Sequence, residues 1–160
     1  MTKRFSKVSP AVWRSRRFMS IPDSDAKLLY LYFVTSEHQT SIGAYVIPTG
    51  YAIADLAWDA SRYEGARAAL VDAELIAFDD ETSIVYVERW FKHSPPMNES
   101  HAQGCQRLIS ELESYGIAEK VQADFDEADR NRNPIPPQRT GNVSPALVES
   151  LGRRGFGSGR

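Results

Sequence analysis

The stretch that decides the fold is residues 59–88, DASRYEGARAALVDAELIAFDDETSIVYVE. Asp59 is a good N-cap, and it precedes a run through Ala73 whose apolar residues recur at helical spacing. Two β-rich runs follow at 75–78 and 84–88, and the polar residues 79–83 separate them, which predicts a hairpin. This stretch therefore predicts one amphipathic helix followed by a two-stranded ribbon.

The helix predicted at 60–73 has two different faces. Its core-facing side consists of Tyr63, Ala66, Leu70 and Ala73. The opposite side carries small or polar residues, namely Ser61, Gly65, Ala68 and Asp72. A helix of this kind buries one stripe and leaves the other to solvent or to a ligand.

The residues before this stretch predict two further helices near the N-terminus. The Ser9-Pro10 pair is a helix-start signal for a short helix at 11–16, in which Val12 and Trp13 should face inward. A second helix is expected at 25–35, capped by Asp23 or Ser24. Its wide apolar face predicts a central core helix, formed by Leu28, Leu29, Leu31, Tyr32 and Phe33.

A short strand and a third helix lie between these helices and the deciding stretch. The strand is expected at 44–47 and ends at Pro48, which lacks the N–H that a central strand needs. The helix runs from Thr49 or Gly50 through Ala57 and buries Ile53 and Leu56. The strand should pair with the hairpin as its third member.

This order of elements predicts an α+β, mostly α, fold. Helix, helix, short strand, helix, helix and hairpin is the order of a winged helix-turn-helix domain, which we assign to residues 1–95. We expect this domain to contain a small three-stranded sheet. Trp90 and Phe91 follow the hairpin directly and should fold back on it as apolar cover.

The remainder of the chain predicts a helical extension at 96–129 and a tail at 130–160. Two amphipathic helices are expected, from Asn98 or Ser100 through Ser114 and over 117–128. Asn, Pro, Gly, Arg and Ser dominate from Arg130 onward, which predicts a disordered, flexible tail. The two helices either pack on the first domain or form a homodimer through residues 98–128.

Composition narrows the class of protein. A length of 160 residues and a hydrophobic fraction of 42% suit one packed domain with appendages. No apolar run approaches the ~18 residues of a membrane span, and the single Cys105 favours a reducing cytoplasm. We expect no metal, because the spacing of His93, His101 and Cys105 matches no usual zinc pattern. We also expect no enzymatic activity and no cofactor.

Five stretches are similar to a known family and together cover roughly the first 100 residues. They are FSKVSPAVWRS at 5–15, DAKLLYLY at 25–32, GAY at 43–45, ALVDAELI at 69–76 and VYVERWFKH at 85–93. They resemble the winged helix domain of phage and prophage replication-initiation proteins, the replisome organisers. The resemblance implies a DNA-binding protein of DNA replication, with a helicase or a helicase loader as its protein partner.

Charge is unevenly distributed along a chain whose formal net charge is only -2. Residues 1–20 carry six basic residues and no acid, and residues 130–160 carry six arginines and one acid. Residues 101–129 carry seven acids and two basic residues. The basic ends bind either phosphate or the protein's own acidic helices, and charge alone leaves both open.

A winged helix reads duplex DNA by placing its recognition helix in the major groove. In the helix at 60–73, Ser61 and Arg62 lie where side chains reach base edges, and Arg67 suits a phosphate contact. Further phosphate contacts are expected from Lys7, Arg14, Arg16, Arg17 and Lys92. The alternative is that the helix arginines are solvated and pair with neighbours such as Glu64.

Two features count against strong DNA binding: the wing tip 79–81 is Asp-Asp-Glu, and Glu64 and Asp72 lie near the exposed side of the recognition helix. Three functions therefore stay open. The first is a phage-type replication initiator that binds duplex DNA, and the second is a transcriptional regulator on the same fold. The third is a protein-interaction module that docks a partner, such as a helicase loader or a nuclease, through its acidic wing and helices.

Overall fold

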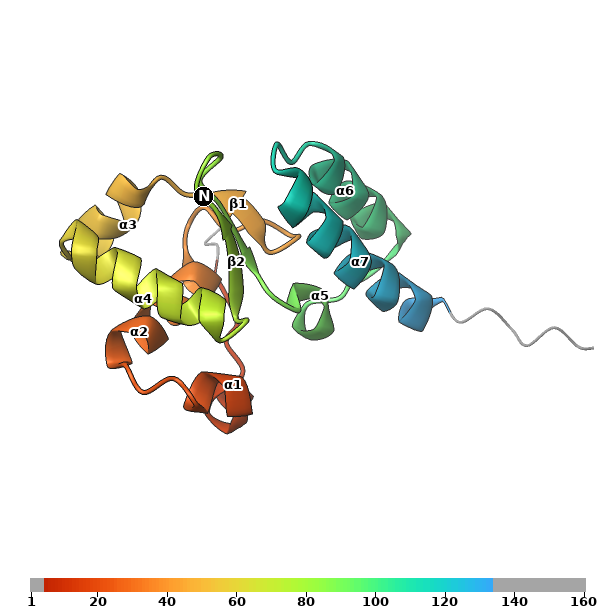
Figure 1. Ribbon diagram of the computed structural model, residues 1–160. Helices are drawn as coiled ribbons and strands as arrows, with labels where there is room; N and C mark the ends of the chain where they lie inside the picture. Colours follow the sequence, from red (N-terminus) through yellow and green to blue (C-terminus); the bar gives the residue numbers. More distant parts are fainter. Residues whose placement is uncertain (1–4, 134–160) are drawn as a thin grey trace, which may run out of the picture.

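A three-stranded antiparallel sheet forms the middle layer of the computed structural model, which describes residues 5–133 (Figure 1). Its strands are β1 (Ala44–Val46), β2 (Ile76–Asp79) and β3 (Ile84–Val87), in the order β1-β3-β2. Val85 of the central strand faces Tyr45 on one side and Phe78 on the other. The predicted hairpin and its third strand are both confirmed.

Helices cover both faces of this sheet, so the described chain has three layers (Figure 1). One core lies between the sheet and the helices that precede the hairpin, and Leu29, Phe33, Tyr63 and Leu70 are among its residues. A second core lies between the sheet and the helices that follow it. The mostly helical α+β class expected from the sequence is confirmed.

The N-terminal segment differs from the prediction of one helix at 11–16. Ser9 caps a 3-10 helix, η1 (Pro10–Arg14), and Ser15 then caps a separate turn of α-helix, α1 (Arg16–Met19). The inward placement of Trp13 is wrong, because its side chain is 55% exposed, while Phe18 is fully buried. The physical reason is the extended backbone of Ser15, which ends the first helix and lets the second one direct Phe18 into the core.

Helix α2 (Ser24–Thr35) begins where the sequence predicts. Asp23 is its N-cap and accepts a hydrogen bond from the N–H of Asp25 at 3.0 Å. Ala26, Leu29 and Phe33 are buried, whereas Leu28 is exposed, so the buried stripe is narrower than predicted. The helix turns by about 100° per residue, and the sheet and the neighbouring helix cover only one side of it.

Helices α3 (Thr49–Leu56) and α4 (Ala60–Asp72) are joined by a short corner. Ala57 ends α3 in the left-handed conformation, and Asp59 then caps α4 by accepting the N–H of Arg62 at 2.9 Å. The predicted faces of α4 are confirmed, since Tyr63, Ala66 and Leu70 are buried. The other face is exposed along its whole length, at Ser61, Gly65, Ala68 and Asp72.

The last three helices are α5 (Trp90–His93), α6 (Glu99–Ser110) and α7 (Tyr115–Arg132). Their buried side chains meet Ile84 and Tyr86 of β3 in the second core. Phe91 is buried there and lies edge-on to Phe125, with 5.4 Å between the ring centroids. Helix α7 lies against β2 and β3, and α6 packs on α7 (Figure 1).

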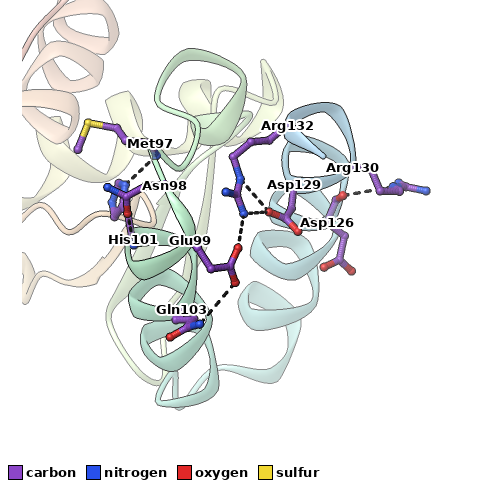
Figure 2. Close-up of polar contacts among 9 residues, drawn as sticks. All are labelled: Met97, Asn98, Glu99, His101, Gln103, Asp126, Asp129, Arg130 and Arg132. Atoms are coloured by element: carbon purple, nitrogen blue, oxygen red, sulfur yellow. Dashed lines mark hydrogen bonds and ion pairs between the residues drawn. The ribbon is translucent and has the colours of Figure 1, made fainter. Parts of the chain in front are cut away.

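Polar contacts fix the ends of α6 and α7 relative to each other (Figure 2). Asn98 caps α6 by accepting the N–H of His101 at 2.8 Å. Arg132 donates to Glu99 at 3.0 Å and to Asp129 at 2.6 Å, which joins the last turn of α7 to the first turn of α6. A cation in the last turn also interacts favourably with the helix dipole.

These contacts extend α7 beyond the boundary that the sequence predicts for the tail. We expected disorder from residue 130, but α7 continues through Arg132. The prediction was wrong for these first tail residues because their stabilising partner, Glu99, lies in another helix. The rest of the predicted tail, residues 134–160, lies outside the described residues, as do Lys3 and Arg4.

Candidate nucleic-acid interface

The exposed face of α4 carries mainly small side chains. Ser61, Gly65 and Ala68 follow one another along it, and a methyl group added at Gly65 would have no other atom within 4 Å. The opposite side of the helix packs on α2 and on the hairpin through Tyr63 and Leu70. A helix with this surface permits a close approach of another molecule's backbone.

Arg62 is held in place at the N-terminal turn of this face. Its Nε and Nη2 donate to the two carboxylate oxygens of Asp25, at 2.6 and 2.8 Å. Its guanidinium also lies over the ring of Trp58, with 4.6 Å to the centroid. The hydrogen bonds from Arg62 lower the pKa of Asp25, so the carboxylate remains charged at neutral pH.

Part of the Arg62 side chain nevertheless faces solvent. The side chain is 47% exposed, and among residues 5–133 no acceptor lies within hydrogen-bonding distance of its Nη1. A bidentate pair with a carboxylate uses two of the three nitrogens of a guanidinium and fixes its plane. Arg62 is therefore oriented by Asp25 and keeps one nitrogen for a further acceptor.

Arg67 lies flat against the hairpin. Its guanidinium is 4.1 Å from the centroid of Phe78 and 5.5 Å from that of Tyr63. Its Nη2 donates to Asp80 at 2.8 Å, and only 17% of its side chain is exposed. The structure therefore joins Arg67 to the hairpin turn, and a phosphate would have to displace Asp80 to reach it.

Several carboxylates surround the exposed face of α4. In the hairpin turn, Asp80 is paired with Arg67, and Asp79 accepts the N–H of Glu81 at 2.9 Å. A hydrogen bond from the side chain of Ser114 lowers the pKa of Asp79. On α4, Glu64 and Asp72 are exposed and form no ion pair among the described residues. The two helix arginines are thus paired, and the remaining charge beside them is negative.

The basic residues of the N-terminal segment occupy different positions. Lys7, Arg14 and Arg16 are exposed. Arg17 is partly buried and donates from Nη1 to the carbonyl oxygen of Glu74 at 2.7 Å, next to the C-terminal end of α4. Of this set, Arg17 is the one whose bonding places it beside α4.

A groove of about 490 Å³ beside β2 brings Arg17 together with Arg89 and Lys120. Arg89 is in the left-handed conformation, with φ +60°, and Lys120 is paired with Glu88 at 2.8 Å. Arg89 and Lys120 are not predicted as site residues from the sequence. No local signal identifies them, because α1, the corner after β3 and α7 meet only in the folded chain.

Lys92 is not brought to α4. It lies on α5 and lines a separate groove of about 700 Å³, whose other wall is α7 with Asp124 and Glu127. Helices α5 and α7 lie on the other side of the sheet from α4 (Figure 1). A contact made by Lys92 would therefore involve another part of the ligand than a contact made by Ser61 or Arg62.

Of the groups considered for metal binding, His101 is hydrogen-bonded and Cys105 is buried. His101 Nδ1 accepts the N–H of Met97 at 3.2 Å, so this nitrogen is engaged within its own helix start (Figure 2). Cys105 is fully buried, and burial raises the pKa of its thiol, which disfavours the nucleophilic thiolate. In the described part of the chain, no three His, Cys, Asp or Glu residues are grouped to hold a metal ion.

None of the helices in residues 5–133 combines the length and the apolar character needed to cross a bilayer. No protein-family model, curated protein or solved structure matches this chain.

Proposed function

We propose that this protein is a non-enzymatic winged helix-turn-helix protein that binds duplex DNA in phage-type replication initiation. The order α2, β1, α3, α4, β2, β3 and the sheet order β1-β3-β2 support this fold assignment. In such a domain the second helix of the helix-turn-helix enters the major groove. Here that helix is α4, with α3 before it and the β2–β3 hairpin as the wing.

The exposed face of α4 is the observation that carries the proposal. A recognition helix must approach base edges closely, and Ser61, Gly65 and Ala68 offer no bulk to prevent it. At its N-terminal end, Arg62 is preoriented by Asp25 and Trp58, with one nitrogen available to a base or a phosphate. Arg17 adds positive charge beside its C-terminal end, and Arg14 and Arg16 are exposed on the same N-terminal segment.

The ion pairs of α4 also predict modest affinity. A phosphate that binds Arg67 replaces Asp80, so the net gain is smaller than for an unpaired arginine. Fewer free cations also release fewer counterions from the DNA. We therefore propose that duplex binding is measurable at low salt and falls as salt rises with the shallow slope of a few phosphate contacts, and that a helicase or a helicase loader adds affinity in the complete assembly.

Ala68→Glu tests the placement of α4 in the groove. The new side chain adds bulk and negative charge in the middle of the exposed face, so we expect duplex affinity to fall at least about tenfold, which corresponds to ~1.4 kcal/mol. Fluorescence anisotropy with a labelled random-sequence duplex at low salt measures this. Ala123→Glu is the matched control, because Ala123 is an exposed helical alanine on α7. Equal affinities of the two variants would contradict the proposal.

Replacing the carboxylates that hold the two arginines should strengthen binding. Asp25→Asn and Asp80→Asn each remove a negative charge beside the DNA and free a guanidinium, so we expect Kd to fall about 2- to 5-fold per change, the range of exposed ion pairs. Glu127→Gln removes the same charge from α7, beyond the second core, and should leave Kd unchanged. An equal effect of all three changes would indicate net charge rather than the arginines.

A second candidate function rests on the carboxylates themselves. Because Glu64 and Asp72 are exposed on α4 and the hairpin turn is acidic, the same surface suits a basic protein partner. The double variant Arg62→Ala, Arg67→Ala separates the two functions. Loss of duplex binding supports the DNA function, and unchanged partner capture without measurable DNA binding supports the interaction module.

A transcriptional regulator would use the same interface as an initiator. The bound site distinguishes them, since a regulator binds an operator and an initiator binds an origin repeat.

A further inference from the structure

Trp13 lies on the surface of the N-terminal segment. Its side chain is 55% exposed, whereas Trp58 is buried. The indole packs against the buried ring of Phe18 in a T-shaped arrangement, with 5.3 Å between centroids and 81° between planes. An aromatic ring with one buried aromatic neighbour is therefore partly exposed to solvent.

Unpaired cations flank this ring in the chain. Arg14 follows Trp13 directly, Arg16 lies two residues further on, and both are exposed. Neither forms an ion pair among residues 5–133, in contrast to Arg62 and Arg67 on α4. Residues 1–20 contain no acid, so no carboxylate of this segment competes for these guanidinium groups.

We infer that Trp13, Arg14 and Arg16 form a binding site for single-stranded nucleic acid. An exposed aromatic ring among cations is the chemistry that binds single strands, because a splayed base stacks on the ring while the cations contact the flanking phosphates. A duplex offers only base edges and phosphates, since its bases are already stacked on one another. The site belongs to η1 and α1 and shares Arg14 and Arg16 with the proposed duplex interface, but stacking of a base on Trp13 is specific to a single strand, so the two functions can be tested separately.

A purely apolar protein partner fits this surface less well. Such a partner would leave the two flanking guanidinium groups without acceptors at the edge of the contact, at a cost in desolvation. Nucleic acid supplies a ring and two phosphates together. The observations therefore favour the single strand, and a protein partner becomes one of the outcomes that the experiment distinguishes.

The test is a titration of the full chain with a fluorescein-labelled dT oligomer of about 12 nucleotides, within the usual range of site sizes. Trp13→Ala should weaken binding about tenfold, the loss of one stacked base. Trp13→Phe keeps an aromatic ring and should stay within about twofold of the original protein. Tyr115→Ala is the matched control, because Tyr115 is an aromatic residue of α7 that is 89% exposed. It should bind like the original protein.

The two arginines have their own readout. The logarithm of affinity falls with the logarithm of salt by roughly 0.7 per phosphate contact on single strands. Arg14→Gln together with Arg16→Gln should therefore reduce that slope by about 1.4, and Arg107→Gln, an exposed arginine of α6, should not change it. Circular dichroism and thermal unfolding of each variant verify that the fold is retained.

Distinct outcomes separate this inference from the proposed duplex function. Weaker dT binding by Trp13→Ala, with dT binding retained in Ala68→Glu, supports the single-strand site even if no duplex binds. Absence of dT binding, or equal dT binding by Trp13→Ala and Tyr115→Ala, overturns it whatever the duplex affinity. If a protein partner binds only the variants that keep Trp13, and Trp13→Ala binds dT like the original protein, the ring serves that partner instead.

Discussion

Gly43→Ala should lower the free energy of unfolding by about 2–5 kcal/mol, the sum of a backbone and a steric cost. Gly43 has φ +72°, a left-handed conformation that costs other residues about 1–2 kcal/mol. A Cβ at this position would lie 2.3 Å from Cγ of Trp90. Trp90 cannot easily move away, because its Nε1 donates to the carbonyl oxygen of Ser41 at 2.9 Å and its ring packs on both cores.

The substitution should also weaken the sheet, since the carbonyl oxygen of Gly43 accepts the N–H of Val87 at 2.9 Å at the end of the β1–β3 ladder. Urea denaturation followed by circular dichroism measures the change. Gly104→Ala is the control, because Gly104 lies inside α6 with no atom near the new methyl group, and it should stabilise the protein by about 0.5–1 kcal/mol. A Gly43→Ala protein as stable as the original would mean that Trp90 does not close this corner.

Asp124→Ala should cost about 3 kcal/mol, because two hydrogen bonds to one charged group are lost at about 1.5 kcal/mol or more each. Its Oδ2 accepts the O–H of Tyr86 and the N–H of Phe91, the latter at 3.2 Å. This carboxylate therefore joins α7 to β3 and to α5. Burial and the neighbouring Asp124 raise the pKa of Tyr86, so the phenol remains a donor throughout the neutral range.

Asp126→Ala is the control for this prediction. Asp126 lies on the same helix and is exposed, with side-chain bonding to Gln122 one turn away, so its loss should cost well under 1 kcal/mol. Tyr86→Phe removes the partner O–H, and the double variant with Asp124→Ala should be less destabilised than the sum of the two single changes. If Asp124→Ala unfolds at the same urea concentration as Asp126→Ala, the hydrogen bonds of Asp124 do not help to hold α7 on the sheet.

The two predictions examine neighbouring contacts of the second core. Gly43 precedes Ala44, which pairs with Tyr86, and Asp124 accepts from Tyr86 and from Phe91, the residue after Trp90. In both cases the loss in stability reports how firmly the last three helices are attached to the sheet. A protein in which both changes had little effect would have a hairpin and helices α2–α4 that fold without them.

Local chemistry was sufficient to predict most elements of this fold. Asp23, Asp59 and Asn98 each cap a helix where the sequence places one, because a cap depends on a side chain and an N–H two or three residues away. The hairpin and the buried face of α4 likewise follow from periodicity within short segments. The inward placement predicted for Trp13 is wrong, because its exposure depends on how two short helices are joined at Ser15.

The candidate interface was predictable only as a list of residues. Arg62 and Arg67 stand on the predicted helix, but their partners are 37 and 13 residues away in sequence, so no pattern within α4 indicates that both are paired. The convergence of Arg17, Arg89 and Lys120 depends in the same way on three distant segments. Helix caps and helical spacing depend on residues that are close together in the sequence. The amino-acid order alone therefore specifies them. The pairing of the charged residues and the exposure of Trp13 depend on how the helices pack on both faces of the sheet. Only the tertiary structure determines them.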